Sequence, residues 1–241
     1  MSILPPNLAS DLQFYLSGPL PCPYLPEQVE RKLFTRIQNN GSNSDASING
    51  ALCRAGFRRS QDIIYRPACN ACNACIPVRV PVKAFLPSRS LKRVAARNRD
   101  LRKEDAPLQS SAELFGLFCA YQKARHGDSD MAHMTEADFS AMLKEGRADT
   151  HLFCLRDGKG ALKGCMIADA VGDGFSAVYS FFTPAEPRRS LGTTLILSLI
   201  DEALDRHKPF VYLGYWIAKT RKMAYKSRFQ PLQFLGPNGW N

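Results

Sequence analysis

The sequence predicts an α/β (α+β) protein with a mixed sheet in its second half. The first reason is the order of hydrophobic patterns beyond residue 111, which runs helix, helix, three strands, helix, strand. The second is composition: 45% of the 241 residues are hydrophobic and 22% are charged, as in ordinary globular proteins. At roughly 150 residues per domain, this length fits one large domain or two small ones.

The chain is strongly basic. It carries 32 Lys and Arg against 22 Asp and Glu, a formal net charge of +10, which favours a polyanionic partner such as nucleic acid. The alternative is a soluble protein whose basic charge serves no such partner. No apolar run reaches the roughly 18–20 residues of a membrane helix, and the pattern of a secretory signal is missing. We therefore expect a cytoplasmic protein without membrane contact.

The first half is expected to contain short elements between turns. Six prolines within residues 1–30 favour extended or turned backbone. The expected elements are a strand over Leu12–Leu16, a helix over Glu27–Ile37, a loop over Asn39–Ser47, a helical turn over Asn49–Gly56 and a strand over Arg58–Tyr65. Because of its two prolines, Ile76–Val82 is expected to be an edge strand or an extended segment.

A basic helix over Ser88–Lys103 is expected to join the two halves, with Ser88 or Ser90 as its N-cap. Its apolar stripe is narrow, so we interpret it as a solvated linker. Farther along, Thr135 and Asp138 form a candidate capping pair. The remaining pattern predicts helices over Ala112–His126, Glu136–Lys144 and Arg188–Arg206, and strands over His151–Leu155, Lys163–Val171, Phe175–Thr183 and Phe210–Tyr215.

Four cysteines form the first candidate site. Cys69, Cys72 and Cys75 follow a CxxCxxC spacing, whose thiolates can turn toward one zinc ion or an iron–sulfur cluster. A fourth ligand is needed, and Cys22 is the best remaining candidate because the other cysteines occupy core-like positions. The alternative is a tight loop whose cysteines act as small hydrophobic residues or as a redox pair.

A second candidate site lies at the start of the last long helix. Arg188, Arg189 and Gly192 follow a strand and a turn, and free backbone N–H groups at such a helix start bind anions. Acyltransferases of the GNAT type hold the pyrophosphate of coenzyme A with an R/Q-x-x-G-x-G/A turn. The spacing of Arg189 and Gly192 matches this turn, although Thr194 replaces its last Gly or Ala. An ordinary capped helix is the alternative.

The C-terminal segment combines cations with aromatic rings. Residues 206–241 contain seven Lys or Arg and no acid, with tyrosines and a tryptophan between them. Bases stack on aromatic faces and phosphates pair with cations, so this segment suits a single-stranded RNA end. A basic surface helix over an aromatic core edge is the alternative.

Together these motifs resemble the aminoacyl-tRNA–protein transferase family, and most closely its short bacterial aspartate/glutamate leucyltransferases. The resemblance covers nearly the whole chain and is carried by Tyr65–Val80, Arg89–Arg102, Ser180–Pro184, Arg189–Gly192 and Tyr212–Pro231. The cysteines depart from the arginyltransferase pattern. Cys22 lacks the second thiol of a CxxC, and Cys69, Cys72 and Cys75 replace an adjacent Cys-Cys pair.

The resemblance implies a small family-specific N-terminal domain over residues 1–87, a basic linker helix over 88–104 and a GNAT-like acyltransferase domain over 105–241. It also implies transfer of an amino acid from aminoacyl-tRNA to the α-amine of proteins with N-terminal Asp or Glu, which creates an N-degron for protein degradation. Leucine is the expected donor, with arginine as the alternative. We expect a monomer that requires no cofactor, with an iron–sulfur cluster or zinc at the cysteines as the other option.

Each candidate residue has an expected role within this resemblance. Arg66 and Arg79 flank the cysteine loop and are the candidates for binding the acceptor carboxylate, with Arg58 and Arg59 close in sequence. Asp169 and Glu186 are candidates for accepting the amine proton, and a route through the ribose hydroxyl is the alternative. The expected contacts with donor tRNA are Arg89, Lys92, Arg93, Arg97, Lys222 and Lys226 along its backbone, Tyr215, Trp216 and Tyr225 at the terminal adenosine or aminoacyl group, and Arg188, Arg189 and Gly192 at the terminal phosphates.

Two other classes of function stay open at this point. A non-catalytic tRNA- or RNA-binding protein explains the charge and the aromatic residues but leaves the GNAT-like turn unused. An enzyme dependent on acetyl-coenzyme A explains the turn but neither the basic C-terminus nor the cysteine loop.

Overall fold

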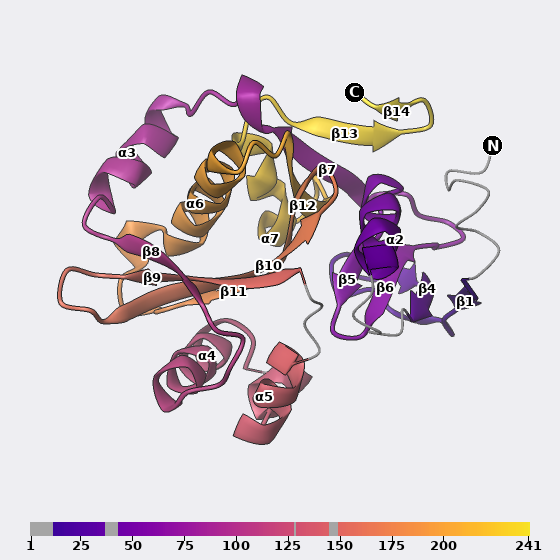
Figure 1. Cartoon of the computed structure of the whole chain (residues 1–241). Coiled ribbons are helices and arrows are strands. Elements are labelled where there is room, and N and C mark those ends of the chain that lie inside the picture. Colours follow the sequence, from indigo (N-terminus) through magenta and orange to yellow (C-terminus); the bar gives the residue numbers. More distant parts are fainter. Residues whose placement is uncertain (1–11, 37–42, 128, 145–148) are drawn as a thin grey trace. The chain divides into compact units, whose positions relative to one another are not determined.

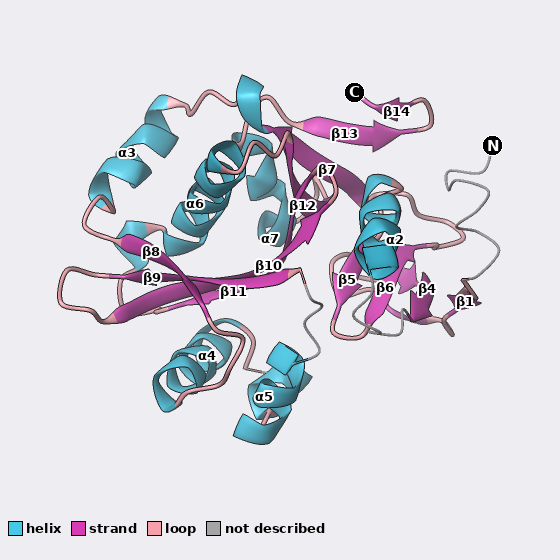
Figure 2. Ribbon diagram, viewed as in Figure 1, coloured by secondary structure: helices cyan, strands magenta, loops and turns pink. Residues whose placement is uncertain are grey.

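The computed structural model describes residues 12–36, 43–127, 129–144 and 149–241 (Figures 1 and 2). Two compact units share the chain. The first comprises the residues up to Leu86, Val171–Ser176 and Lys208–Asn241, and the second comprises Pro87–Ala170 and Ala177–His207. The C-terminal segment therefore belongs with the N-terminal part of the chain. The contiguous domain scheme with boundaries after residues 87 and 104 stays a prediction.

One part of the first unit is a small antiparallel sheet with one helix. Its strand order is β1-β4-β6-β5, and β2 pairs with β3 in a separate ribbon. Helix α2 joins this sheet because Leu52 and Ala55 pack with Phe57 and Ile64. The elements are β1 (Tyr15–Leu16), β2 (Leu20–Pro21), β3 (Val29–Glu30), β4 (Lys32–Arg36), α2 (Asn43–Arg54), β5 (Arg58–Ser60) and β6 (Ile63–Pro67).

The other part of the first unit belongs to a large mixed sheet. Strand β7 pairs antiparallel with β12 on one side and with β13 on the other. Strand β12 also pairs in parallel with the first three residues of β11 (Gly174–Phe182). The elements are β7 (Ile76–Pro81), η1 (Val82–Ala84), β12 (Phe210–Trp216), α7 (Arg221–Ala224), η4 (Tyr225–Arg228), β13 (Gln233–Gly236) and β14 (Gly239–Trp240).

The second unit is layered. Strand β9 lies between β8 and β10 and is antiparallel to both. Helices α4 and α5 cover one face of these strands, and α3 and α6 cover the other (Figure 2). The elements are α3 (Arg89–Arg97), β8 (Arg102–Ala106), α4 (Ala112–Arg125), η2 (Asp130–His133), α5 (Glu136–Lys144), β9 (Thr150–Arg156), β10 (Leu162–Val171), η3 (Pro187–Arg189) and α6 (Leu191–Asp205), together with the rest of β11.

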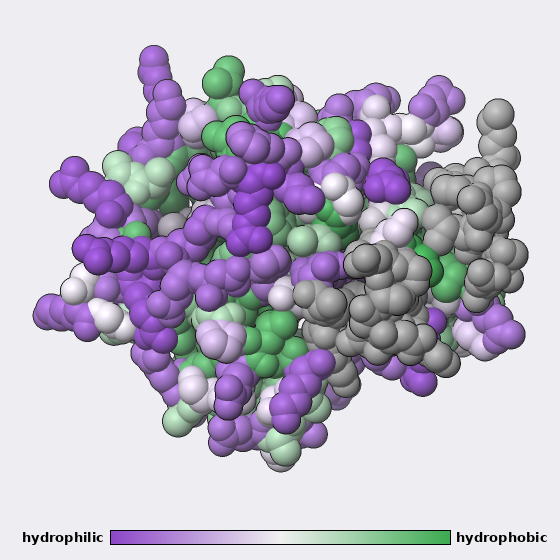
Figure 3. All heavy atoms as spheres, viewed as in Figure 1, coloured by the Kyte–Doolittle hydropathy of each residue, from purple (hydrophilic) through white to green (hydrophobic). Residues whose placement is uncertain are grey.

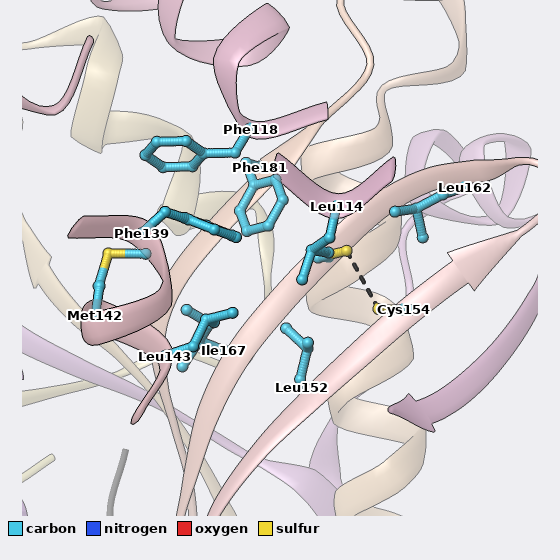
Figure 4. Packing of buried hydrophobic residues seen from close by; sticks show 11 residues of the cluster. Leu114, Phe118, Phe139, Met142, Leu143, Leu152, Cys154, Leu162, Ile167 and Phe181 are labelled. Carbon is cyan, nitrogen blue, oxygen red and sulfur yellow. Dashed lines mark hydrogen bonds between the residues drawn. The ribbon is translucent and has the colours of Figure 1, made fainter. Parts of the chain in front are cut away.

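The core of the second unit is aromatic. Phe118 of α4, Phe139 of α5 and Phe181 of β11 meet face and edge, with ring centroids 4.7 Å apart for Phe118–Phe139 and 5.6 Å for Phe118–Phe181 (Figure 4). Such pairs add to the free energy of burial. Aliphatic residues of β9 and β10, among them Leu152 and Ile167, close the cluster from the sheet side.

Most of the elements expected in the second half are confirmed to within one or two residues: α4, α5, β9, β10, β11 and β12. The capping pair at the start of α5 is confirmed as well. The carboxylate of Asp138 accepts from the Thr135 hydroxyl at 2.7 Å and from its backbone N–H at 2.9 Å. The Asp138 N–H donates to the Thr135 hydroxyl at 3.2 Å.

The expected helix over Glu27–Ile37 is wrong. Glu27 adopts a left-handed φ of 63°, and the residues after it form β3 and β4. Strand β4 pairs with both β1 and β6, so a long-range partner decides its conformation where local propensity favours a helix. Ile37 lies outside the described residues.

The predicted edge position of Ile76–Val82 is also wrong, because β7 is an interior strand. Its prolines are tolerated because β13 pairs only with Val78 and Arg79, between Pro77 and Pro81. The missing proline N–H groups therefore fall outside the stretch that is paired on both sides.

Four other boundaries need correction. Helix α2 already begins at Asn43, so the predicted Asn39–Ser47 loop is too long, and its residues 39–42 lie outside the described residues. The strand predicted over Arg58–Tyr65 is a hairpin of β5 and β6, turned at Gln61 with a φ of 53°. The linker helix ends at Arg97 because residues 102–106 pair with β9. Helix α6 begins at Leu191, after Ser190 in a left-handed conformation.

None of the helices in the described ranges is both long and apolar enough to cross a membrane.

The aromatic cluster predicts the effect of shortening one ring. Replacing Phe118 by Ala should lower the free energy of unfolding by about 3–5 kcal/mol, because the buried ring leaves a cavity between two helices and the sheet. Phe115→Ala on the same helix is the matched control, since that ring is only partly buried. Urea denaturation measures both variants, and an equal loss for the two would contradict this account of the core.

Candidate functional site

The four candidate cysteines lie around one cavity of the first unit. Its volume is about 280 Å³, and Cys22, Cys69, Cys72 and Cys75 all line it. Cys22 directly follows β2, and the other three thiols come from the loop between β6 and β7. Leu25 and Val29 come from the turn and the strand that follow Cys22. Tyr24, Tyr65 and Tyr215 supply the aromatic part of the wall. We call this space the cysteine cavity.

The four cysteines of this cavity are the candidates for holding a metal ion or a cluster. Burial, followed by the neighbouring thiols, raises the pKa of Cys75 to about 12. Across the residues that the structure describes, no group of three or more His, Cys, Asp or Glu is arranged to hold a metal ion. The iron–sulfur or zinc option for Cys22, Cys69, Cys72 and Cys75 is therefore unsupported.

The cysteine cavity contains an ion pair at its rim. The Lys32 ammonium lies 2.9 Å from a carboxylate oxygen of Glu30 and 5.3 Å from the ring centroid of Tyr65. Both charges line the cavity, and they largely neutralise each other. The cavity wall is consequently close to neutral.

Tyr215 lines the cysteine cavity from β12 and is held at both ends. Its hydroxyl lies 2.9 Å from the carbonyl oxygen of Gly56 and 3.0 Å from that of Tyr65. Its backbone carbonyl oxygen accepts a hydrogen bond from Nζ of Lys226 at 2.6 Å. Burial raises the pKa of the Tyr215 hydroxyl, so it remains a donor at neutral pH. The ring is thereby fixed as a wall of the site.

A second cavity of about 570 Å³ lies next to the cysteine cavity. The two share Pro67, Asn73, Cys75 and Tyr215 in their linings. The floor of the second cavity is largely apolar and comes from the start of β7 and from β13, and the cation on its wall is Arg66 of β6. We call it the Arg66 cavity.

Arg66 and Arg79 differ in how their charge is used. Arg79 is 9% exposed, donates to Gln233 at 2.8 Å and to the Tyr212 hydroxyl at 3.2 Å, and stacks on Phe210. Arg66 is half-buried, and its guanidinium lies over the ring of Phe57 at 5.6 Å. No carboxylate or hydrogen-bond acceptor of the described chain pairs with Arg66. Of the two predicted arginines, Arg66 is the one available to a ligand.

The two neighbouring arginines have structural surroundings. Arg59 is buried and donates to the carbonyl oxygen of Gln61 at 3.2 Å, within the hairpin turn. Arg58 packs against Gly214, which has a φ of 71°, and a Cβ at that position would lie 3.0 Å from the guanidinium. Glycine is therefore required there both for its conformation and for space.

The C-terminal cations do not form one surface. Lys226 is 5% exposed, and its amine contacts the Tyr215 carbonyl and, at 3.5 Å, the sulfur of Met223. Burial holds its pKa well below the usual value. The expected pairing of Lys226 with a tRNA phosphate is therefore wrong, because the side chain is enclosed. Lys222 and Tyr225 are exposed.

Trp216 belongs to the packing of the first unit. Its indole N–H donates to the carbonyl oxygen of Ala224 at 3.3 Å, and its ring meets Phe234 edge to face at 5.4 Å. It is only partly buried. The expected roles of Tyr215, Trp216 and Tyr225 at the donor end of tRNA stay predictions.

The second unit presents the predicted basic helix. Ser88 caps α3, and Leu91 and Val94 are buried. Arg89, Lys92, Arg93 and Arg97 are all exposed, and the visible face around α3 is strongly hydrophilic (Figure 3). Arg97 also donates to the carbonyl oxygen of Arg188. Because all four side chains are exposed, they can meet a polyanion.

The turn before α6 is braced by a buried amide. The Asn98 amide nitrogen lies 2.8 Å from the Arg189 carbonyl oxygen and 2.9 Å from the Thr194 hydroxyl. The Arg189 guanidinium donates to Asn98 at 2.8 Å and also pairs with Glu186 and Asp100. Arg189 is thus occupied by protein groups, whereas Arg188 is exposed. A Cβ at Gly192 would lie 2.9 Å from the Phe182 ring, so this glycine permits close packing.

Both predicted proton acceptors are engaged. Asp169 is 1% exposed and accepts from the Thr150 hydroxyl at 2.7 Å. Glu186 pairs with Lys163 at 2.8 Å and with Arg189 at 3.2 Å. The hydrogen bond from Lys163 is the main reason that the pKa of Glu186 is lowered. A proton-accepting role for either residue stays a prediction.

Several residues of the site lack a signal in the sequence. Leu25, Val29 and Tyr24 come to the cysteine cavity through the β2–β3 ribbon, which the sequence pattern assigns in part to a helix. Phe234 and Leu235 reach the Arg66 cavity through the pairing of β13 with β7. For the cysteine cavity, the spacing of Cys69, Cys72 and Cys75 was the sequence signal that side chains gather there.

Comparison with family models identifies both parts of the chain. The model described as "Arginine-tRNA-protein transferase, N terminus" matches residues 20–93, and the one described as "Arginine-tRNA-protein transferase, C terminus" matches residues 113–236. Together they span well over half of the sequence.

Curated relatives agree with these matches, and one solved structure shares the fold. A protein of Paramagnetospirillum magneticum named aspartate/glutamate leucyltransferase is 48% identical, covering 94% of this chain and 92% of that protein. One of the same name from Parvibaculum lavamentivorans is 46% identical, covering 95% and 93%. The crystal structure of FemX aligns with a TM-score of 0.51 and 8% identity over 92% of this chain and 85% of that one. That likeness concerns the fold alone and agrees with the predicted GNAT-like acyltransferase fold.

The enclosed amine of Lys226 predicts a pH dependence of stability. Its lowered pKa means that the folded protein releases this proton before the unfolded chain does, whose lysine pKa is about 10.4. Within that window the unfolded state binds more protons, so the contribution to the free energy of unfolding rises with pH, by up to about 1.4 kcal/mol per pH unit, and falls as pH falls. Lys226→Met should remove this rise.

Urea denaturation at a series of pH values below the lysine pKa of the unfolded chain, which is about 10.4, measures the effect. Lys222→Met is the matched control, because that lysine is exposed in the same segment and should leave the pH dependence unchanged. The same pH dependence in wild type and Lys226→Met would show that the buried group is a charged ammonium.

Proposed function

Because the chain belongs to the arginine-tRNA-protein transferase family, we propose that it transfers leucine from leucyl-tRNA to the α-amine of proteins that begin with Asp or Glu. The relatives named aspartate/glutamate leucyltransferase support both the donor and the acceptor. The structural observation that carries the proposal is Arg66, an available cation on the wall of a cavity.

The acceptor carboxylate pairs with Arg66. A guanidinium offers two parallel N–H donors to a carboxylate, and such charge-assisted bonds are among the strong ones in proteins. The Phe57 ring limits rotation of the guanidinium and shields one of its faces from water. The bond is therefore formed in a partly dry setting, where it is stronger than at the surface.

The reaction is aminolysis of an ester. The α-amine nitrogen attacks the leucyl carbonyl carbon, a C–N bond forms, and the C–O bond to the terminal ribose breaks. The amine loses a proton and the ribose oxygen gains one. The ester is already activated, so holding the two reactants together supplies most of what is needed. An α-amine with a pKa of about 7.7–8.0 is partly neutral under physiological conditions.

The proton passes most directly between the two substrates. Asp169 is enclosed and Glu186 is paired with two cations, so neither carboxylate is poised as a base. The ribose hydroxyl beside the ester can take the proton from the amine and pass one to the departing oxygen. This route balances without a protein base.

The exposed cations of α3 bind the donor tRNA. Arg89, Lys92, Arg93 and Arg97 present one charged helix face to the phosphate backbone. Arg188, exposed beside the start of α6, adds a contact for the terminal phosphates. The product carries an additional N-terminal leucine, and we propose that this residue marks it as an N-degron in the cytoplasm.

A transfer assay tests the proposal. Purified protein is incubated with tRNA labelled on leucine or on arginine and with peptides that start with Asp, Glu, Lys or Ala. Label should move from leucyl-tRNA to the Asp and Glu peptides. Movement from arginyl-tRNA instead would change the donor and keep the family. Salt-dependent tRNA binding without any transfer would favour the non-catalytic alternative.

Arg66→Gln should raise the KM for the Asp peptide by about 10–100-fold, because a charge-assisted hydrogen bond contributes about 1.5–3 kcal/mol. The KM for leucyl-tRNA should not change. Arg36→Gln in β4 is the control, since that arginine is exposed and pairs only with Asp62 among described residues. An unchanged peptide KM in Arg66→Gln would place the carboxylate elsewhere.

Removing cations of α3 should weaken tRNA binding and its salt dependence together. For the double variant Lys92→Ala, Arg93→Ala, the slope of log Kd against log salt should fall by about 1 for each lost phosphate contact. Filter binding at a series of salt concentrations measures it. Lys123→Ala with Lys159→Ala removes the same charge from exposed sites elsewhere in the second unit and should leave the slope unchanged.

A further inference from the structure

We propose that the cysteine cavity binds the leucyl side chain of the donor and selects leucine over arginine. This inference rests on the proposed function and adds to it a residue-level account of donor choice. It gives the four cysteines a role as a neutral, apolar lining.

The size of the cavity suits a branched aliphatic side chain. Its volume of about 280 Å³ is at the lower end of ligand cavities and leaves room for one side chain of leucine size with its neighbouring atoms. Leu25, Val29 and Ala68 supply aliphatic contacts around it. Burial of each methylene is favourable, so an aliphatic donor gains from every carbon it places there.

The thiols add to this apolar character. A protonated cysteine behaves as a small hydrophobic residue with only a weak donor. Cys22, Cys69, Cys72 and Cys75 all line the cavity. The CxxCxxC spacing therefore gathers small side chains in one wall of it.

The charges of the cavity disfavour a guanidinium. Among the described residues that line it, Glu30 is the one carboxylate, and the Lys32 ammonium already pairs with it at 2.9 Å. A donor arginine would have to displace Lys32 or leave its own charge unpaired in a partly buried space, which costs free energy. Leucine meets neither penalty.

The position of the cavity also fits a donor site. The acceptor carboxylate is assigned to Arg66 in the second cavity, and both cavities are bounded by Tyr215 and Cys75. With the leucyl side chain in the cysteine cavity and the acceptor side chain in the Arg66 cavity, the ester carbonyl and the α-amine meet beside these two shared residues. The first unit alone thus holds both reacting side chains.

The test varies the amino acid while the tRNA stays the same. One tRNA that accepts leucine is charged with leucine, phenylalanine, alanine or arginine, and transfer to a single Asp peptide is measured. Leu25→Ala should enlarge the cavity and raise the kcat/KM of phenylalanyl relative to leucyl donor by about tenfold. Ala68→Leu should lower leucyl transfer by about tenfold and spare alanyl transfer. The peptide KM should stay constant in both.

Two further variants keep the test interpretable. Val29→Phe fills the rim at a residue that is 55% exposed, so it should reproduce the effect of Ala68→Leu without disturbing the core. Leu86→Ala makes the same change as Leu25→Ala at a residue that is 80% exposed and outside the cavity, and it should leave donor preference unchanged. Circular dichroism and thermal unfolding report whether each variant folds.

Each of three outcomes would overturn a different assignment. Folded cavity variants with the donor preference of wild type would overturn the inference. Variants that change the peptide KM instead would assign the cysteine cavity to the acceptor. Wild type that transfers arginine but not leucine from the same tRNA would overturn the proposed function itself.

Discussion

The candidate site depends on how Tyr215 is held. Its hydroxyl is bonded to carbonyl oxygens of two other segments, its own carbonyl accepts from Lys226, and the residue lines both cavities. Each of these buried polar groups would cost about 1–3 kcal/mol if left without a partner, so the arrangement is strongly determined. The tyrosine therefore ties β12 to the small N-terminal sheet. It explains why residues from both ends of the chain build one site.

The cations divide into those that hold the fold and those that are available to a ligand. Arg79 and Arg189 each bond to several protein groups, and their loss would leave carboxylate or hydroxyl partners unsatisfied. Arg66 lies on an aromatic face without a carboxylate partner among the described residues. All of these side chains look alike in the sequence. Their environment alone distinguishes a structural ion pair from a binding residue.

The sequence predicts local features well and long-range ones poorly. The bounds of α5 and its capping pair follow from residues that are neighbours in sequence. The helix expected over Glu27–Ile37 fails because strands from other segments pair with it, and β7 becomes interior because β13 arrives from the far end of the chain. For the site, the spacing of the cysteines predicted that their thiols gather, and the four cysteines do line one cavity. Its chemistry depends on burial and on Lys32, which no spacing reveals.

The engagement of Asp169 and Glu186 by other protein groups is consistent with the chemistry. Cleavage of a peptide bond would need an activated nucleophile and a stabilised leaving group. An aminoacyl ester instead brings a good leaving group, with a hydroxyl beside it. The protein then needs rigid side-chain cavities more than it needs titrating groups. The thiols that line the cysteine cavity, the Glu30–Lys32 pair and the hydrogen bond from Thr150 to Asp169 all hold side chains in place. Specificity arises from the side chains that line the two cavities, and the reactivity comes from the aminoacyl ester of the donor tRNA.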